Sequence, residues 1–189
     1  MSNPDSPDGL DLIGPGAPVA APDPAALANA KTEARTGGAK LAKSGFYVAM
    51  ARESAGGRVA PHNGERHVIL VVEDDADLAN LVRDVLSSEG LATRFARNRT
   101  EINTEFNQAA LPDLVLLDVS LPDANGFEIL ERIRGHPRIA KMPVIMVTGR
   151  SEVADVARGL SLGADGYVTK PFKIAALVSA VQTVLGLAS

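Results

Sequence analysis

Short apolar runs recur along the last two-thirds of the chain, and amphipathic segments separate them. Val68–Val72, Leu114–Leu117 and Val144–Val147 are continuously apolar, which predicts strands that are buried on both faces. Weaker strands are expected near Leu91–Ala96 and at Tyr167–Thr169. The pattern therefore predicts five strands.

Helical periodicity fills the segments between these strands. The first predicted helix follows Asp75 and ends at Gly90, and the others cover Thr100–Ala110, Phe127–Ile133, Val153–Leu162 and Ile174–Leu185. Five strand–helix units predict an α/β fold, with a parallel sheet that carries helices on both faces. We place this domain at residues 66–189.

The first 65 residues have a different character, and we interpret them as an extension and a linker. Residues 1–30 are rich in Pro, Gly, Ala and Asp, a composition that buries too little apolar surface to favour order. A short helix is possible within residues 38–52, although Gly45 weakens it. Gly56-Gly57 and Pro61–Gly64 are typical of a linker. The extension is predicted to be mostly disordered.

Composition excludes several classes of function. The formal net charge is −4 without a clustered basic stripe, so we expect no nucleic-acid partner. No apolar run approaches the roughly 20 residues that span a bilayer, and the acidic N-terminus lacks a signal core. The absence of cysteine rules out disulfides and thiolate metal sites. We expect a cytoplasmic protein without a membrane partner.

Polar residues with chemical potential follow the predicted strands directly. They are Glu73, Asp74 and Asp75 after the first strand, Asp118 after the third, Thr148 and Gly149 after the fourth, and Lys170-Pro171 after the fifth. Ligands of open parallel sheets bind beyond the carboxyl ends of the strands. The sequence therefore gathers four acids, a hydroxyl and a lysine at one edge.

This set of side chains favours a divalent cation. Crowded carboxylates repel one another, and one of them would otherwise take up a proton. Oxygen ligands without His or Cys favour a hard ion, and we expect Mg²⁺. A carboxylate beside Mg²⁺ can attack a phosphoryl group, and the Lys170 ammonium and the Thr148 hydroxyl would meet the transferred charge.

Taken singly, these residues have ordinary interpretations. Asp75 is more plausible as a helix N-cap than as a ligand. Asp118 alone would be a turn residue at a strand end, Thr148-Gly149 a turn and Lys170 a solvated lysine. Their order and spacing together favour the functional interpretation.

Four motifs resemble the receiver domain of bacterial response regulators. They are Val71–Asp75, Leu117–Gly126, Pro143–Gly149 and Tyr167–Phe172, and the resemblance covers about residues 66–188. It implies a flavodoxin-like, five-stranded (βα)5 sheet in the order 2-1-3-4-5, for which a chemotaxis receiver is a known example.

The resemblance also implies a role for each residue. Asp118 would accept a phosphoryl group from a histidine kinase or a histidine phosphotransfer protein. Mg²⁺ would be held by Asp74 directly, by Glu73 through water, by Asp118 and by the Ser120 carbonyl. Lys170, after a cis bond to Pro171, would pair with the phosphoryl group, Thr148 would bind it, and Tyr167 would turn inward as the switch residue. Ser120 and Arg150 would tune dephosphorylation.

Three other functions compete with this interpretation. A flavin carrier shares the topology, but Glu73-Asp74-Asp75 would repel its phosphate. An Mg²⁺ phosphatase with an Asp nucleophile usually has a second acid two residues later, where Ser120 stands here. A phosphate-independent interaction module would lack part of the site, and no part is missing.

The output of the signal is the least determined feature. We expect a stand-alone receiver that is no enzyme beyond its own phosphorylation and dephosphorylation, or a fragment of a longer regulator or hybrid kinase. The predicted contact face for a downstream protein or a homodimer combines the fourth helix, the fifth strand and the fifth helix.

Overall fold

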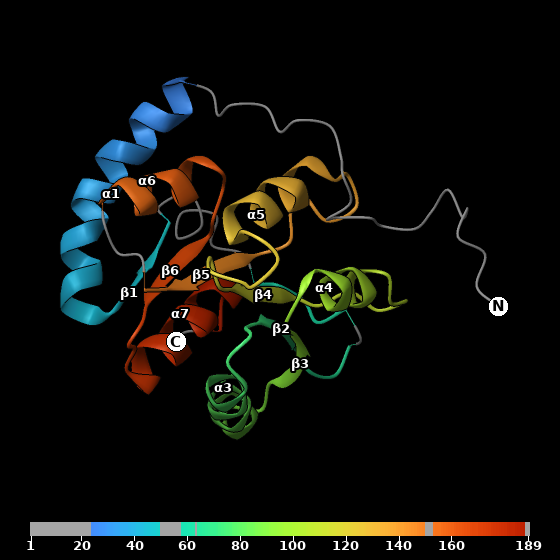
Figure 1. The fold of residues 1–189 in the computed structure, drawn as a ribbon. Coiled ribbons are helices and arrows are strands. Elements are labelled where there is room, and N and C mark those ends of the chain that lie inside the picture. Colours follow the sequence, from blue (N-terminus) through green and yellow to red (C-terminus); the bar gives the residue numbers. More distant parts are fainter. Residues whose placement is uncertain (1–23, 50–57, 63, 150–152, 188–189) are drawn as a thin grey trace.

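The computed structural model describes residues 24–49, 58–62, 64–149 and 153–187. A six-stranded sheet forms its centre (Figure 1). Its strands are β1 (Phe46–Val48), β2 (Val68–Val72), β3 (Ala92–Ala96), β4 (Leu114–Leu117), β5 (Val144–Thr148) and β6 (Gly166–Thr169). All five predicted strands are present, and β2 and β4 have the predicted bounds.

The strand order is β1-β6-β5-β4-β2-β3, and all pairs are parallel except β1 with β6. Without β1, this order is the predicted 2-1-3-4-5, so the flavodoxin-like fold is confirmed. The strand count differs, because a segment before the predicted domain adds a sixth, antiparallel strand at the edge.

Helices cover both faces of the sheet. Figure 1 shows α4, α5 and α6 over one face and α3 and α7 over the other. Their bounds are α3 Ala76–Ser88, α4 Arg99–Phe106, α5 Gly126–Gly135, α6 Val153–Ser161 and α7 Ile174–Leu185. Among the described residues, no helix is both long enough and apolar enough to span a membrane.

Alternate residues of each strand belong to two different apolar cores. Leu70 and Leu117 point into the core beneath α4, α5 and α6, whereas Val71 and Leu116 point into the core beneath α3 and α7. Side chains of a strand alternate between its faces, so a continuous apolar run is required here. This requirement explains why the strands were visible in the sequence.

Side-chain caps set the starts of the helices that follow the strands. The Asp75 carboxylate accepts hydrogen bonds from the amides of Asp77 and Leu78 at 2.9 and 3.1 Å, which confirms the predicted cap. Asn125 caps α5 in the same way, through the Phe127 amide at 2.9 Å. These caps fix the directions in which the loops after β2 and β4 leave the sheet.

The described part of the N-terminal extension departs from the predicted disorder. Residues 24–44 form helix α1 (Pro24–Ser44), and Phe46–Val48 form β1. The sequence suggested that Gly45 lies inside a short helix within residues 38–52 and weakens it. In the structure, Gly45 does not lie inside a helix. It ends α1 instead, with φ of 81° and its amide bonded to the Leu41 carbonyl at 2.7 Å. Residues 1–23 and 50–57 lie outside the described residues.

One stripe of α1 is buried against the rest of the molecule. The stripe consists of Ala30, Ala34, Gly37 and Leu41, which recur at helical spacing. Ala34 and Leu41 belong to the same core as Leu70 and Phe127. The domain boundary that we placed at residue 66 marks a change in sequence composition. In the structure, α1 and β1 belong to the same sheet and core as the residues after this boundary.

Candidate functional site

The carboxyl ends of four strands bring the predicted site residues together. Glu73 and Asp74 follow β2, Asp118 follows β4, Thr148 ends β5, and Lys170 follows β6. Carboxylate oxygens of Glu73, Asp74 and Asp118 lie within 4.8 Å of one another. The predicted gathering of acids at one sheet edge is thus present in the structure.

Lys170 links two buried acids. Its ammonium donates to Glu73 Oε2 at 2.6 Å and to Asp118 Oδ2 at 2.7 Å. Glu73 is 5% exposed and Asp118 is 6% exposed, so both carboxylates depend on this cation for compensation. Lys170 therefore holds the loops after β2, β4 and β6 in one arrangement.

The backbone around Asp118 fixes its carboxylate. Its amide donates to the Val72 carbonyl at 3.0 Å, which ties the end of β4 to β2. Its Oδ1 accepts the Ser120 amide at 3.0 Å, so each carboxylate oxygen has a donor. The side chain is held at the sheet edge by two independent contacts.

Gly126 permits the loop after Asp118 to close on itself. A Cβ built on Gly126 would lie 2.3 Å from the Asp118 carbonyl oxygen and 2.8 Å from Val119 Cα. Both are backbone atoms, so a side chain at this position would displace the loop. Gly126 stands in the motif that resembles receivers, but only the structure reveals its contact with Asp118.

Burial and charge shift two pKa values in the site. Burial raises the pKa of Glu73 above its ordinary value of 4.5, the Asp118 charge adds to this, and Lys170 opposes it. Burial lowers the pKa of Lys170, but the bonds and charges of Asp118 and Glu73 outweigh that effect and raise it above 10.5. The two acids thus favour the charged form of Lys170, while burial disfavours the charged form of Glu73.

The acidic cluster has the donor chemistry of a hard divalent cation. Its ligand atoms are carboxylate oxygens alone, which suit Mg²⁺ better than zinc or copper. Glu73 and Asp118 are buried, whereas Asp74 is exposed and open to solvent. The residues present therefore fit Mg²⁺.

Thr148 and Tyr167 lie on the two strands beside the lysine. Thr148 is 1% exposed, and its carbonyl accepts the Lys170 amide at 2.9 Å. Tyr167 is already fully buried, with its hydroxyl donating to the Asp155 carbonyl at 3.0 Å. Its predicted inward movement is therefore not needed in this arrangement, and its switch role stays a prediction.

Three further expectations concern the surroundings of the site. The Lys170-Pro171 peptide bond is cis, as the resemblance implies. A Cβ built at Gly149 meets no described atom within 4 Å, which fits the open space expected there. Arg150 lies outside the described residues.

Comparisons with known proteins agree with the fold. The family model of the response regulator receiver domain matches residues 69–182. The chain belongs to this family. The match begins within β2 and ends within α7, so α1 and β1 stand outside the part that defines the family.

Its relatives include regulators with longer chains. The receiver is 40% identical over 117 residues to the DNA-binding response regulator MtrA of Mycolicibacterium paratuberculosis, covering 62% of this chain and 50% of MtrA. It is 39% identical over 117 residues to the phosphate regulon transcriptional regulatory protein PhoB of Rhizobium meliloti, covering 62% and 51%. The chain thus spans about half the length of these relatives.

Solved receiver structures share the fold. The non-phosphorylated HemR receiver domain of Leptospira biflexa aligns with a TM-score of 0.59 and 29% identity, over 66% of this chain and 98% of that one. The signal receiver domain of a histidine kinase from Syntrophus aciditrophicus aligns with a TM-score of 0.57 and 35% identity, over 63% and 89%.

The contact at Gly126 predicts a specific loss of stability. Gly126→Ala should lower the free energy of unfolding by about 1–3 kcal/mol, because the added methyl overlaps backbone at Asp118 and Val119. Gly135→Ala, at the other end of α5, is the matched control, since its Cβ meets no described atom within 4 Å. Urea unfolding of both variants measures the difference, and equal stabilities would contradict the contact.

The raised pKa of Glu73 predicts a pH-dependent stability. The folded state binds this proton more readily than the unfolded chain, so the contribution is fully present below pH 4.5 and is lost as pH rises through the raised pKa. Glu73→Gln removes the carboxyl group that titrates. The free energy of unfolding of this variant should therefore increase relative to that of the wild type as the pH rises from 4.5 through the raised pKa.

Urea midpoints from pH 4.5 to neutral pH, measured in metal-free buffer, test this expectation. The exposed Glu65→Gln serves as the control and should run parallel to the wild type. A Glu73→Gln curve that also runs parallel to the wild type would contradict the raised pKa.

Proposed function

We propose that this receiver is a phosphoacceptor switch in a two-component phosphorelay, and that Asp118 carries the phosphoryl group. The observation that supports this most strongly is the Lys170 ammonium, which reaches Asp118 Oδ2 at 2.7 Å from the loop after β6, two strands away from β4. A fixed cation beside a buried carboxylate offers a counter-charge for the incoming phosphoryl oxygens before they arrive.

The transfer exchanges one bond for another. A carboxylate oxygen of Asp118 forms a bond to phosphorus while the P–N bond of a phosphohistidine donor breaks, and the donor imidazole leaves with a proton from solvent. The Lys170 ammonium first pairs with the Asp118 carboxylate. After the transfer it pairs with the phosphoryl oxygens. The donor is a histidine kinase or a histidine phosphotransfer protein.

The proposed Mg²⁺ ligands are Glu73, Asp74, Asp118 and the Ser120 carbonyl. Bound Mg²⁺ would supply the positive charge that neutralises the phosphoryl oxygens during transfer. The length of the Glu73 side chain, already engaged by Lys170, favours contact through water. Asp74 is the exposed member of the set, which suits direct coordination of a hydrated ion.

Thr148 is the proposed sensor of the phosphoryl group. It ends β5 next to Asp118, and its carbonyl already accepts the amide of Lys170. A hydroxyl that turns toward the phosphoryl oxygens would couple Asp118 to β5 and to Tyr167 on β6. The chemistry serves this switch and is not a turnover of external substrates.

We infer that the output is a protein contact in the cytoplasm. MtrA is named a DNA-binding regulator, in contrast to the absence of a nucleic-acid partner predicted for this chain. Because the chain spans about half of MtrA, its own output stays a proposal, either as a stand-alone receiver or within a longer regulator or hybrid kinase.

Phosphorylation by a small donor tests the proposal. Acetyl phosphate with Mg²⁺ should add one phosphoryl group per chain, detected by intact mass, and hydroxylamine should remove it as expected for an acyl phosphate. Chelation of Mg²⁺ should abolish the labelling, and so should Asp118→Asn.

Asp84→Asn is the matched control, because Asp84 is an exposed α3 carboxylate outside the acidic cluster of Glu73, Asp74 and Asp118. It should label like the wild type. Labelling that persists in Asp118→Asn would place the phosphoryl group elsewhere. Sustained release of phosphate from an external ester would instead support the phosphatase alternative.

A further inference from the structure

Residues 24–48 cover part of the predicted contact face. That face consists of α6, β6 and α7, the fourth helix, fifth strand and fifth helix of the receiver. Helix α1 packs along α6, and β1 contacts both β6 and α7 (Figure 1). We call residues 24–48 the cap. The surface on which a partner was predicted to dock is occupied by the chain itself.

The cap and the receiver fit each other through small residues on both sides. A Cβ at Gly166 of β6 would lie 3.1 Å from the Tyr47 carbonyl oxygen, so β1 comes close to β6 there. A Cβ at Gly37 of α1 would lie 2.7 Å from the Tyr47 ring. The ring is 5% exposed, and its hydroxyl donates to Glu33 at 2.7 Å.

Tyr47 lies directly beside the predicted switch residue. It pairs with Tyr167 in the antiparallel register of β1 and β6, and both rings point into the same core. On the other side, a Cβ at Gly159 of α6 would lie 2.6 Å from the Tyr167 ring. Tyr167 is thus enclosed by α6 and by its cross-strand neighbour from the cap.

A hydrogen bond joins the cap to the residue before the phosphate-pairing lysine. The amide of Thr169 donates to the carbonyl of Gly45 at 3.3 Å, and Gly45 is the junction between α1 and β1. Lys170 follows Thr169 and binds Asp118. One strand end therefore carries contacts to the phosphorylation site and to the cap.

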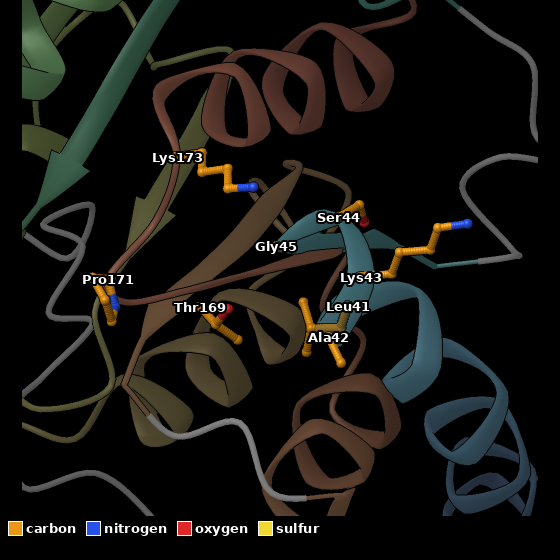
Figure 2. A pocket seen from close by; sticks show the side chains of 8 residues that line it. All are labelled: Leu41, Ala42, Lys43, Ser44, Gly45, Thr169, Pro171 and Lys173. Atoms are coloured by element: carbon orange, nitrogen blue, oxygen red, sulfur yellow. The ribbon is translucent and has the colours of Figure 1, made fainter.

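The junction between the cap and the receiver contains open space. A cavity of about 290 Å³ lies beside the Thr169–Gly45 contact, between the end of α1 and the segment that connects β6 to α7. Figure 2 shows its lining residues, which come from these two segments: Leu41, Ala42, Lys43, Ser44, Gly45, Thr169, Pro171 and Lys173. The loop that contains Lys170 has room to shift here, and missing packing lowers the cost of separating the two segments.

Removing the cap would expose an edge that favours self-pairing. β6 would become the last strand of the sheet, with a row of unpaired amide and carbonyl groups. Two copies of β6 can pair antiparallel across a two-fold axis, which gives a closed dimer with the same surface on both subunits. Leu41, at 3% exposure, belongs to the apolar core, so its departure would also uncover apolar surface on the receiver.

We propose that the cap competes with a second copy of the chain for the α6–β6 face, and that phosphoryl transfer to Asp118 weakens the cap. The second part rests on the proposed function. The capped state is a monomer and the uncapped state a dimer. When Lys170 turns toward a phosphoryl group, the loop after β6 moves and the Thr169–Gly45 contact loosens. Phosphorylation shifts the balance only by this differential interaction.

A buried charge on α1 tests the competition without phosphate. Ala34→Glu places a carboxylate at a fully buried position of the cap, whereas Ala28→Glu places one on its exposed side. Ala34→Glu should shift the mass in light scattering from monomer to dimer. Ala28→Glu and the unphosphorylated wild type should stay monomeric.

Hydrogen exchange on the same samples verifies release of the cap. Amides of residues 41–49 should exchange faster in Ala34→Glu than in Ala28→Glu. Equal exchange rates in the two variants would contradict the packing of α1 against α6. A monomeric Ala34→Glu with a released cap would overturn the competition. A dimeric wild type before phosphorylation would overturn it as well.

A reversible crosslink tests the coupling to phosphorylation. Phe46 and Val168 lie opposite each other in the β1–β6 register, and the chain has no native cysteine. Phe46→Cys combined with Val168→Cys should therefore lock the cap when oxidised. Acetyl phosphate with Mg²⁺ should convert the wild type and the reduced variant to dimers and leave the oxidised variant monomeric.

The intact mass of each sample separates the two proposals. Absence of labelling at Asp118 is a failure of the proposed function, while the Ala34→Glu experiment still decides the competition. Full labelling without a change in mass by light scattering overturns the weakening of the cap. Dimers of the oxidised, labelled variant would show that the second copy binds elsewhere, which also overturns the proposal.

Discussion

The Lys170 ammonium between Glu73 and Asp118 is the interaction on which the site depends. Parallel strands bring these two buried carboxylates to one edge, where without a cation one of them would be protonated. Removing one partner of such a buried set typically costs about 3–5 kcal/mol. Lys170 satisfies both acids at 2.6 and 2.7 Å and so makes the gathering of strand ends compatible with a stable fold. The same cation is available to a phosphoryl group.

The part of the fold that follows local patterns could be predicted from the sequence. β2, β4 and α7 have the predicted bounds, because a strand buried on both faces must be continuously apolar and a helix of one amphipathic face repeats visibly. The convergence of Glu73, Asp118 and Lys170 also followed, since parallel topology alone decides where strand ends meet. α4 is shorter than predicted and ends at Phe106, its last buried residue.

The cap and the fine geometry of the site were not predictable, because both depend on contacts between distant segments. The buried stripe of α1 consists largely of Ala and Gly, which gives little hydrophobic signal although it packs closely. β1 has three residues and becomes a strand only by pairing with β6. Gly45 suggested a weak helix, but its role is to end one. The closeness of Gly126 to the Asp118 backbone is likewise invisible in the sequence of the loop.

β6 connects the site around Asp118 with the N-terminal extension. It lies between β5, which ends at Thr148, and β1, which carries Tyr47, and it leads directly into Lys170. A change in charge at Asp118 acts on Lys170, and any adjustment of Lys170 acts on a strand whose other edge is held by the extension. Because packed interfaces tend to have discrete arrangements rather than to deform continuously, the extension does more than lengthen the sheet. In the proposed mechanism, β6 transmits the state of Asp118 to a second neighbour, β1, that is retained or released.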